Sequence, residues 1–443
     1  MGPRFYALLT AVFVALTTAF FLRSRLFAAC CDASGYLVLG QTMWTKGLFA
    51  KLVLSDLRTI GYPAFIAFTV WLPLPLSLDL KVVVLQSFLY WASATALVAS
   101  SRPLLSDRPS RRALAVGLLG NPLAAMYCAD TMTESLSLTI FLACVALLLR
   151  VREKLALHRR GCGLPFGLGI LVGLALVVRP ANLAFVIAAF LAMAIPPLWG
   201  TETLKRRLLQ SASSLIALSA GLYLAVSPQV AVNLKHFDKA TPLPAASLGT
   251  LQMREGIRHL KYATFVGTPK VQQVRYASPF ARGTEVLPAD TFGWYLRYPG
   301  RGLLTIAGHI FATIALDPLF TYVRDLEPWY RIPVVSIDAV VIVFGFGWLV
   351  RGLWRRRRQA AGCPVAWFLL GSMVLSLGIV AFAIPESRFG FLTNSVCFAS
   401  VCGAAARAIA GPIKLRLAWM VAGIAGSAAF SLLALGLRRL ANI

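Results

Sequence analysis

The chain has 443 residues, of which 58% are hydrophobic and 14% charged, and its mean hydropathy of +0.74 excludes a soluble globular protein. A formal net charge of +26 would favour nucleic-acid binding in a soluble protein, but here the basic residues lie mostly in short runs between apolar segments. That distribution is the positive-inside pattern of a polytopic membrane protein, so we expect membrane lipids and no nucleic acid among its partners.

The first apolar segment, FYALLTAVFVALTTAFFL, predicts a span that leaves the membrane near Leu22 if the N-terminus is cytoplasmic. The basic run at 101–112 must then also be cytoplasmic, so the chain can cross the membrane only once between the end of the first span and this run. Residues 81–100 have a spanning length, whereas the competing stretch 61–76 is short and carries a glycine and three prolines. We therefore expect residues 23–80 to form a long external loop with interfacial helices.

The same alternation predicts the rest of the topology. Further spans are expected near residues 113–128, 134–150, 164–179, 182–198 and 211–229, which complete a seven-helix module over residues 1–230. Residues 231–330 are expected to be an external, acceptor-facing region with an interfacial helix, because a crossing there would place the basic run at 351–358 outside. Residues 331–443 supply four more spans, near 332–350, 364–384, 388–406 and 417–435. The predicted fold class is an all-α polytopic membrane protein with about 11 transmembrane helices.

In this predicted topology, most of the acidic residues lie on the external side of the membrane. Only Asp107, Glu153 and Glu202 fall in cytoplasmic loops. The external group comprises Asp32, Asp56, Asp79, Asp130, Glu134, Asp317, Asp325, Glu327 and Glu386. Carboxylates held against a membrane are unfavourable and often mark function, so we expect any chemistry to be external. A transporter would more typically carry charges at the bilayer centre and inverted repeats, and the pattern shows neither.

Short motifs follow one another along the first half of the chain. Asp32 and Tyr36 come after the first span, and Arg58 opens the sequence RTIGYP, which contains Tyr62. The later members are Gln86, Asn121-Pro122, Thr133-Glu134, Gly173-Leu174-Ala175, Arg179-Pro180 and the segment NLKHFDKATPLP at 233–244. In this order and spacing the chain resembles bacterial C-class (GT-C) glycosyltransferases, in the branch of protein O-mannosyltransferases and the lipid A aminoarabinose transferase. The resemblance covers residues 1–245 well and the remainder in general layout.

The resemblance implies an inverting transfer of a hexosyl or pentosyl group from a polyprenyl-phosphate donor to an envelope glycan, lipid or protein. The transfer would take place at the periplasmic face of a bacterial inner membrane. A general base must deprotonate the acceptor hydroxyl, and Asp32 is the candidate, although a lone aspartate after a span is more often a solvated loop residue. The lipid phosphate leaving group needs cations or a metal, and Arg58 and Arg179 are the candidates because guanidinium binds phosphate bidentately.

Alternatives remain for these residues. Arg58 could anchor the loop to lipid headgroups, and Arg179 could cap a short span or pair with Glu134. Asp130 and Glu134 resemble the second acidic site of the family, where one of them could orient the acceptor or bind a divalent cation; a helix N-cap role is the alternative. Many family members carry paired acids at the first site, but Ala33 and Ser34 follow Asp32 here, which argues against a metal at Asp32. Tyr36 and Tyr62 are further candidates for substrate binding.

Two features lie beyond the first half. Glu386 and Arg388, in the sequence ESRF, could line the acceptor cleft or stabilise loops through a salt bridge. A basic group over residues 230–300 would suit an anionic acceptor such as lipopolysaccharide or a phosphorylated glycan, and would equally suit a surface that lies against the membrane. Its members are Arg254, Arg258, Lys261, Lys270, Arg275 and Arg282. A lipid-linked glycan flippase and a non-catalytic membrane assembly factor remain as other function classes.

Overall fold

The computed structural model describes residues 2–24, 31–50, 56–105, 107–156, 161–195, 203–246, 248–266, 271–283, 291–315, 322–323, 331–355, 363–410, 421 and 424–433. Packing divides the chain into two units, Met1–Ala246 with Arg351–Leu375, and Ser247–Val350 with Ser376–Ile443. The three regions expected from the sequence, 1–230, 231–330 and 331–443, remain a prediction. Asp317, Asp325, Glu327, Glu202 and Lys270 lie outside the described residues.

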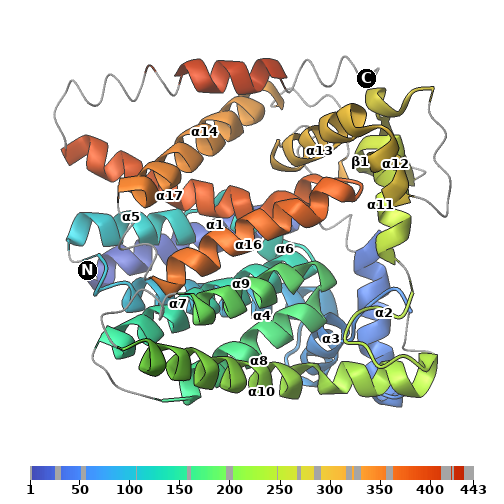
Figure 1. Ribbon diagram of the computed structural model, residues 1–443, viewed down its shortest axis with the longest axis horizontal. Coiled ribbons are helices and arrows are strands. Elements are labelled where there is room, and N and C mark those ends of the chain that lie inside the picture. Colours follow the sequence, from blue (N-terminus) through green and yellow to red (C-terminus); the bar gives the residue numbers. More distant parts are fainter. Residues whose placement is uncertain are drawn as a thin grey trace. The chain divides into compact units, whose positions relative to one another are not determined.

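The described secondary structure of the first unit consists of helices, and its helices up to α10 run from blue to green in Figure 1. The helices are α1 (Pro3–Ser24), α2 (Cys31–Lys46), α3 (Gly61–Trp71), α4 (Leu78–Ser100), α5 (Arg108–Leu119), α6 (Pro122–Ala129), α7 (Thr133–Ala156), α8 (Gly163–Val178), the 3₁₀ helix η2 (Pro180–Asn182), α9 (Leu183–Ala194) and α10 (Leu204–Phe237). Helices α8 and α10 pack closely because Gly221 lets α10 approach the backbone of α8 at Phe166.

Seven helices among the described residues are long and apolar enough to cross a membrane. They are Pro3–Leu22, Leu78–Ser100, Thr133–Glu153, Leu204–Phe237, Val335–Gly352, Pro364–Phe382 and Arg388–Arg407. The chain is therefore a helical, multi-pass membrane protein, as its composition predicts. The shorter apolar helices Gly163–Val178, Pro180–Ala194 and Ile424–Leu433 fall at three of the other predicted spans, so the expected total of eleven is not confirmed.

The predicted span at 113–128 is wrong as a single helix. It divides into α5 and α6 at Gly120 and Asn121. The side-chain oxygen of Asn121 accepts the N–H groups of Leu123 and Ala124 at 3.0 and 3.4 Å, and Pro122 occupies the first helical position. These are the features that start a new helix. An eight-residue α6 is about 12 Å long at 1.5 Å per residue, well short of the hydrocarbon core.

The second unit contains strands that the expected all-α fold lacks. Strands β1 (His259–Val266), β2 (Val271–Ala277) and β3 (Tyr322–Val323) form a sheet in the order β2-β1-β3, with β1 antiparallel to β2 and parallel to β3. Its other elements are α11 (Leu248–Arg258), the 3₁₀ helix η4 (Pro279–Ala281), α12 (Thr291–Arg297), α13 (Pro299–Ile314), α14 (Arg331–Arg355), α16 (Pro364–Phe382), the 3₁₀ helix η5 (Ser387–Gly390) and α17 (Phe391–Ala410). Helix α14 ends within the residues of the first unit, and α16 begins in the first unit and ends in the second.

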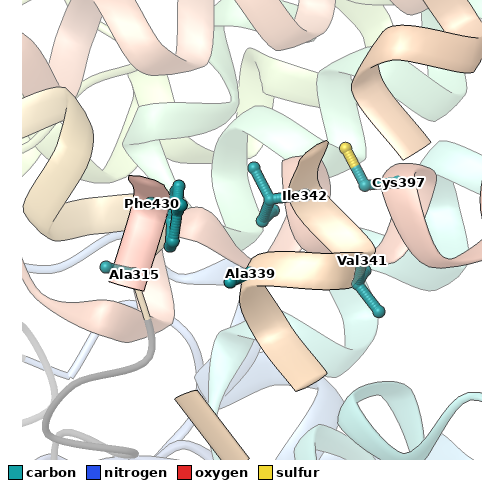
Figure 2. Packing of buried hydrophobic residues seen from close by; sticks show 6 residues of the cluster. All are labelled: Ala315, Ala339, Val341, Ile342, Cys397 and Phe430. Atoms are coloured by element: carbon teal, nitrogen blue, oxygen red, sulfur yellow. The ribbon is translucent and has the colours of Figure 1, made fainter. Parts of the chain in front are cut away.

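Apolar side chains from distant segments form a core in the second unit. Figure 2 shows this cluster, which consists of Ala315, Ala339, Val341, Ile342, Cys397 and Phe430. Lys261 is also buried in this unit, where its ammonium group donates to the carbonyl of Ala315 at 2.7 Å. A cation suits the C-terminal end of α13, so Lys261 stabilises that helix and does not add to the basic surface.

Candidate active site

Asp32 and Arg58 form an ion pair near the start of α2. Asp32 lies in the first turn of the helix, where a carboxylate is favoured by the helix dipole, and its Oδ1 accepts from Arg58 Nη2 at 2.6 Å. The side chains are 33% and 26% exposed, respectively. The base and the phosphate ligand predicted from separate motifs are therefore in direct contact, and both can be reached from outside the protein.

Tyr36 holds the same guanidinium from a second direction. It follows Asp32 by four residues and so lies on the same face of α2, with its ring centroid 4.3 Å from Arg58 Cζ. Burial lowers the pKa of Arg58, but its interactions with Tyr36 and Asp32 raise it, and the net pKa lies above the ordinary value. Arg58 is therefore a permanent cation oriented by two side chains of one helix.

Tyr62 links this pair to the buried interior of the first unit. Its ring meets Tyr36 edge to face at 4.9 Å, and its hydroxyl donates to Gln86 Oε1 at 3.3 Å. Gln86 Nε2 in turn donates to the carbonyls of Cys128 and Asp130 at 2.7 and 2.6 Å. Burial, followed by the negative charges of nearby groups that include Glu134, raises the pKa of Tyr62 well above its usual range. Tyr62 is thus a fixed, protonated donor within the framework of the site.

Glu134 and Arg179 form a second, more buried ion pair. Their charged atoms lie 2.7 Å apart, and the side chains are only 1% and 10% exposed. Arg179 is also the C-cap residue of α8, where its N–H donates to Ala175 at 3.0 Å. Gly61 brings the start of α3 against the backbone of Val177 in the same turn of α8. Both alternatives to phosphate binding by Arg179, capping and pairing with Glu134, are therefore present.

The remaining predicted residues divide between the two units. Asp130 is the C-cap residue of α6, and its charge, like that of Glu134, acts on Tyr62. Glu386 and Arg388 belong to the second unit, where Arg388 Nε donates to Glu386 Oε2 at 2.6 Å. Their side chains are 9% and 17% exposed. The salt bridge, one of the two alternatives that the sequence left open for these residues, is therefore formed.

The acidic residues of the site do not fit a divalent cation. Within the described part of the chain, no three His, Cys, Asp or Glu side chains group together as metal ligands. The carboxylates of Asp32 and Glu134 each contact a guanidinium, which would repel a metal ion. We therefore assign no step of the chemistry to a metal.

Two buried amides that were not among the predicted site residues contribute to the site, although Asn233 opens the motif at 233–244. Gln229 and Asn233 lie four residues apart on α10 and are 1% and 2% exposed; Gln229 contacts the segment that carries Arg58, and Asn233 contacts Gln229. A pair of amides on one face of an apolar helix was the available signal, since buried amides need hydrogen-bond partners.

Comparison with known proteins finds distant structural likenesses. No protein-family model and no curated protein sequence matches the chain. Among solved structures it is similar to the oligosaccharyltransferase of Archaeoglobus fulgidus in the apo form, with a TM-score of 0.45 and 12% identity over 98% of this chain and 55% of that chain. The archaeal oligosaccharyltransferase AglB from the same organism, in complex with an inhibitory peptide and a dolichol-phosphate, gives a TM-score of 0.43 and 11% identity, over 97% of this chain and 55% of that one. The chain spans about half the length of these proteins, and likenesses at this level decide neither family nor activity.

Proposed function

We propose that the chain is an inverting glycosyltransferase that moves a sugar from a polyprenyl-phosphate donor to an acceptor hydroxyl. The contact between Asp32 and Arg58 is the observation that carries this proposal, because it joins a carboxylate and a phosphate-binding cation at one accessible point of a membrane protein. The sequence motifs around both residues support the same chemistry.

In the proposed reaction the donor phosphate replaces Asp32 as the partner of Arg58. Asp32 is then free to accept the proton of the acceptor hydroxyl while the acceptor oxygen attacks the anomeric carbon. The bond between that carbon and the phosphate oxygen breaks, and the electron pair leaves on the polyprenyl phosphate. Arg58 stabilises the negative charge that develops there. Donor binding and release of the base are thus one event.

Glu134 and Arg179 have a supporting role in this proposal. Because Arg179 is almost fully buried and paired with Glu134, Arg58 is the better placed of the two cations to meet a lipid phosphate. The buried pair instead lies beside Tyr62, against whose ring Tyr36 packs, and Tyr36 in turn packs against Arg58.

We place the reaction at the periplasmic face of a bacterial inner membrane, with an anionic envelope glycan such as lipopolysaccharide as the acceptor. The basic residues of the second unit support an anionic acceptor. Arg254, Arg258 and Arg275 all lie within 3.9 Å of the single carboxylate of Glu255, which leaves an excess of positive charge.

Replacing Arg58 with Ala should weaken the binding of a lipid phosphate by about ten- to a hundredfold, because a charge-assisted hydrogen bond is lost. Lys should restore only part of the affinity, since it lacks the forked geometry. The measurement is a titration of the purified protein in nanodiscs with undecaprenyl phosphate.

Arg112→Ala is the matched control, because Arg112 also lies over an aromatic ring, that of Phe5 at 5.6 Å. Arg112 belongs to the basic run at 101–112, which is expected on the cytoplasmic side and not beside Asp32. Its affinity should equal that of the parent protein. If the Arg58→Ala variant bound undecaprenyl phosphate as tightly as the parent protein, Arg58 would not be a ligand of the phosphate.

A further inference from the structure

The segment from Asp56 to Ile60, which carries Arg58, is tied to the rest of the first unit at both of its ends. The carbonyl of Asp56 accepts from the N–H of Ala246 at 2.9 Å. The N–H of Ile60 donates to Gln229 Oε1 at 2.7 Å, across 169 residues of sequence. Thr59 and Ile60 are 4% and 7% exposed. The backbone on either side of Arg58 is therefore held by partners outside the loop.

Gln229 can make this contact in one orientation only. Its Nε2 donates to Asn233 Oδ1 at 2.9 Å, and Asn233 Nδ2 donates to the carbonyls of Thr241 and Leu243 at 2.6 and 2.7 Å. Since the amide nitrogen of Asn233 already faces two carbonyls, its oxygen must face Gln229. The nitrogen of Gln229 then faces Asn233, and its oxygen faces the N–H of Ile60.

The end of α10 closes this arrangement. Asp238 adopts the left-handed conformation, with φ of 53°, and turns the chain back so that Thr241 and Leu243 reach Asn233 and Ala246 reaches Asp56. Lys239 Nζ donates to the carbonyl of Ala245 at 2.6 Å and so braces the returning segment. One stretch of chain therefore supports both ends of the Arg58 segment.

Burying two amides in an apolar helix is unfavourable unless every polar group is paired, whereas a leucine at position 229 would pack without that requirement. What the amides add is a fixed place for the backbone two residues from Arg58. On the basis of the proposed function, we propose that Gln229, oriented by Asn233, is a positioning residue that sets Arg58 at the donor phosphate. Asp32 lies on a separate element, α2, so Gln229 acts on the phosphate-binding cation and not on the base.

Gln229→Leu should therefore weaken undecaprenyl phosphate binding about tenfold, the usual worth of a buried hydrogen bond whose partner is left unpaired. Transfer at saturating donor should also slow, because Arg58 stabilises the charge that develops on the leaving phosphate. In an Arg58→Ala background the same substitution should have no further effect on affinity, because the side chain that it positions is absent. Gln229→Glu is the second variant: it keeps an acceptor for Ile60 but sets a second oxygen against Asn233 Oδ1, and it should weaken binding similarly.

Hydrogen exchange of the Ile60 amide tests the positioning without any substrate. Exchange should be faster in Gln229→Leu than in the parent protein and unchanged in the control Ser227→Ala, whose hydroxyl donates to the carbonyl of Leu224 in its own helix at 3.0 Å. Unchanged Ile60 exchange, or affinity losses that add in the double variant, would overturn the inference. If the parent protein did not bind undecaprenyl phosphate, the proposed function would fail, and Ile60 exchange would still decide whether Gln229 holds the segment.

Discussion

Replacing Asp32 with Asn is expected to slow sugar transfer by on the order of a hundredfold or more, the usual contribution of a positioned base. The binding of lipid phosphate should be retained or become tighter, because the carboxylate that competes with the phosphate for Arg58 is gone. A loss of rate together with a gain in affinity separates this account from one in which Asp32 only stabilises the loop. Single-turnover transfer and a titration with undecaprenyl phosphate measure the two quantities.

Asp79→Asn is the matched control for this variant, since Asp79 also lies in the first turn of a helix, α4. It should transfer sugar at the parental rate. Asp32→Glu should recover little activity, because one added methylene displaces the carboxylate beyond the tolerance of a reactive geometry. If Asp32→Asn transferred sugar as fast as the parent protein, Asp130 or Glu134 would become the better candidate for the base.

The second large effect concerns stability. Glu134→Gln should lower the free energy of unfolding by about 3 kcal/mol, because it leaves the guanidinium of Arg179 buried without its carboxylate. The double variant Glu134→Gln/Arg179→Gln should regain much of that loss, since no uncompensated charge remains. Unfolding of the purified protein in detergent, followed by circular dichroism, provides the measurement.

Arg275→Gln serves as the control, because Arg275 pairs with Glu255 at 3.4 Å but its side chain is 48% exposed. Its removal should change the stability by less than about 1 kcal/mol. A double variant less stable than Glu134→Gln alone would contradict the account of this pair as a structural unit.

Much of the helical framework could be predicted from the sequence, because spanning helices in a membrane protein are long, apolar and flanked by basic runs. The choice of residues 81–100 over 61–76 agrees with the structure, in which α4 has a spanning length and α3 has 11 residues. The division at Gly120 and Asn121 was signalled by the Asn-Pro pair, which starts helices. The pair of strands at 259–277 was signalled by β-branched and aromatic residues in HLKYATFV and VQQVRYA.

The candidate site could be predicted in part. Asp32, Tyr36 and Arg58 belong to motifs close in sequence, and the pairing of Arg179 with Glu134 follows from placing two helix ends on one side of the membrane. The contact between Ile60 and Gln229 could not be predicted, because it spans 169 residues and depends on how α3 packs against α10. Local patterns determine which residues are polar, but only tertiary packing determines which of them meet.

The most direct test of the central claim is to measure, by mass spectrometry, the polyprenyl phosphate that the purified protein releases. The parent protein and the Asp32→Asn variant would each be incubated with lipid-linked sugars extracted from the expressing cells, together with envelope glycans. The account predicts that the parent protein releases polyprenyl phosphate in step with a glycosylated product, and that the Asp32→Asn variant releases almost none while it still binds the lipid. No release by the parent protein, or equal release by the two proteins, would contradict it.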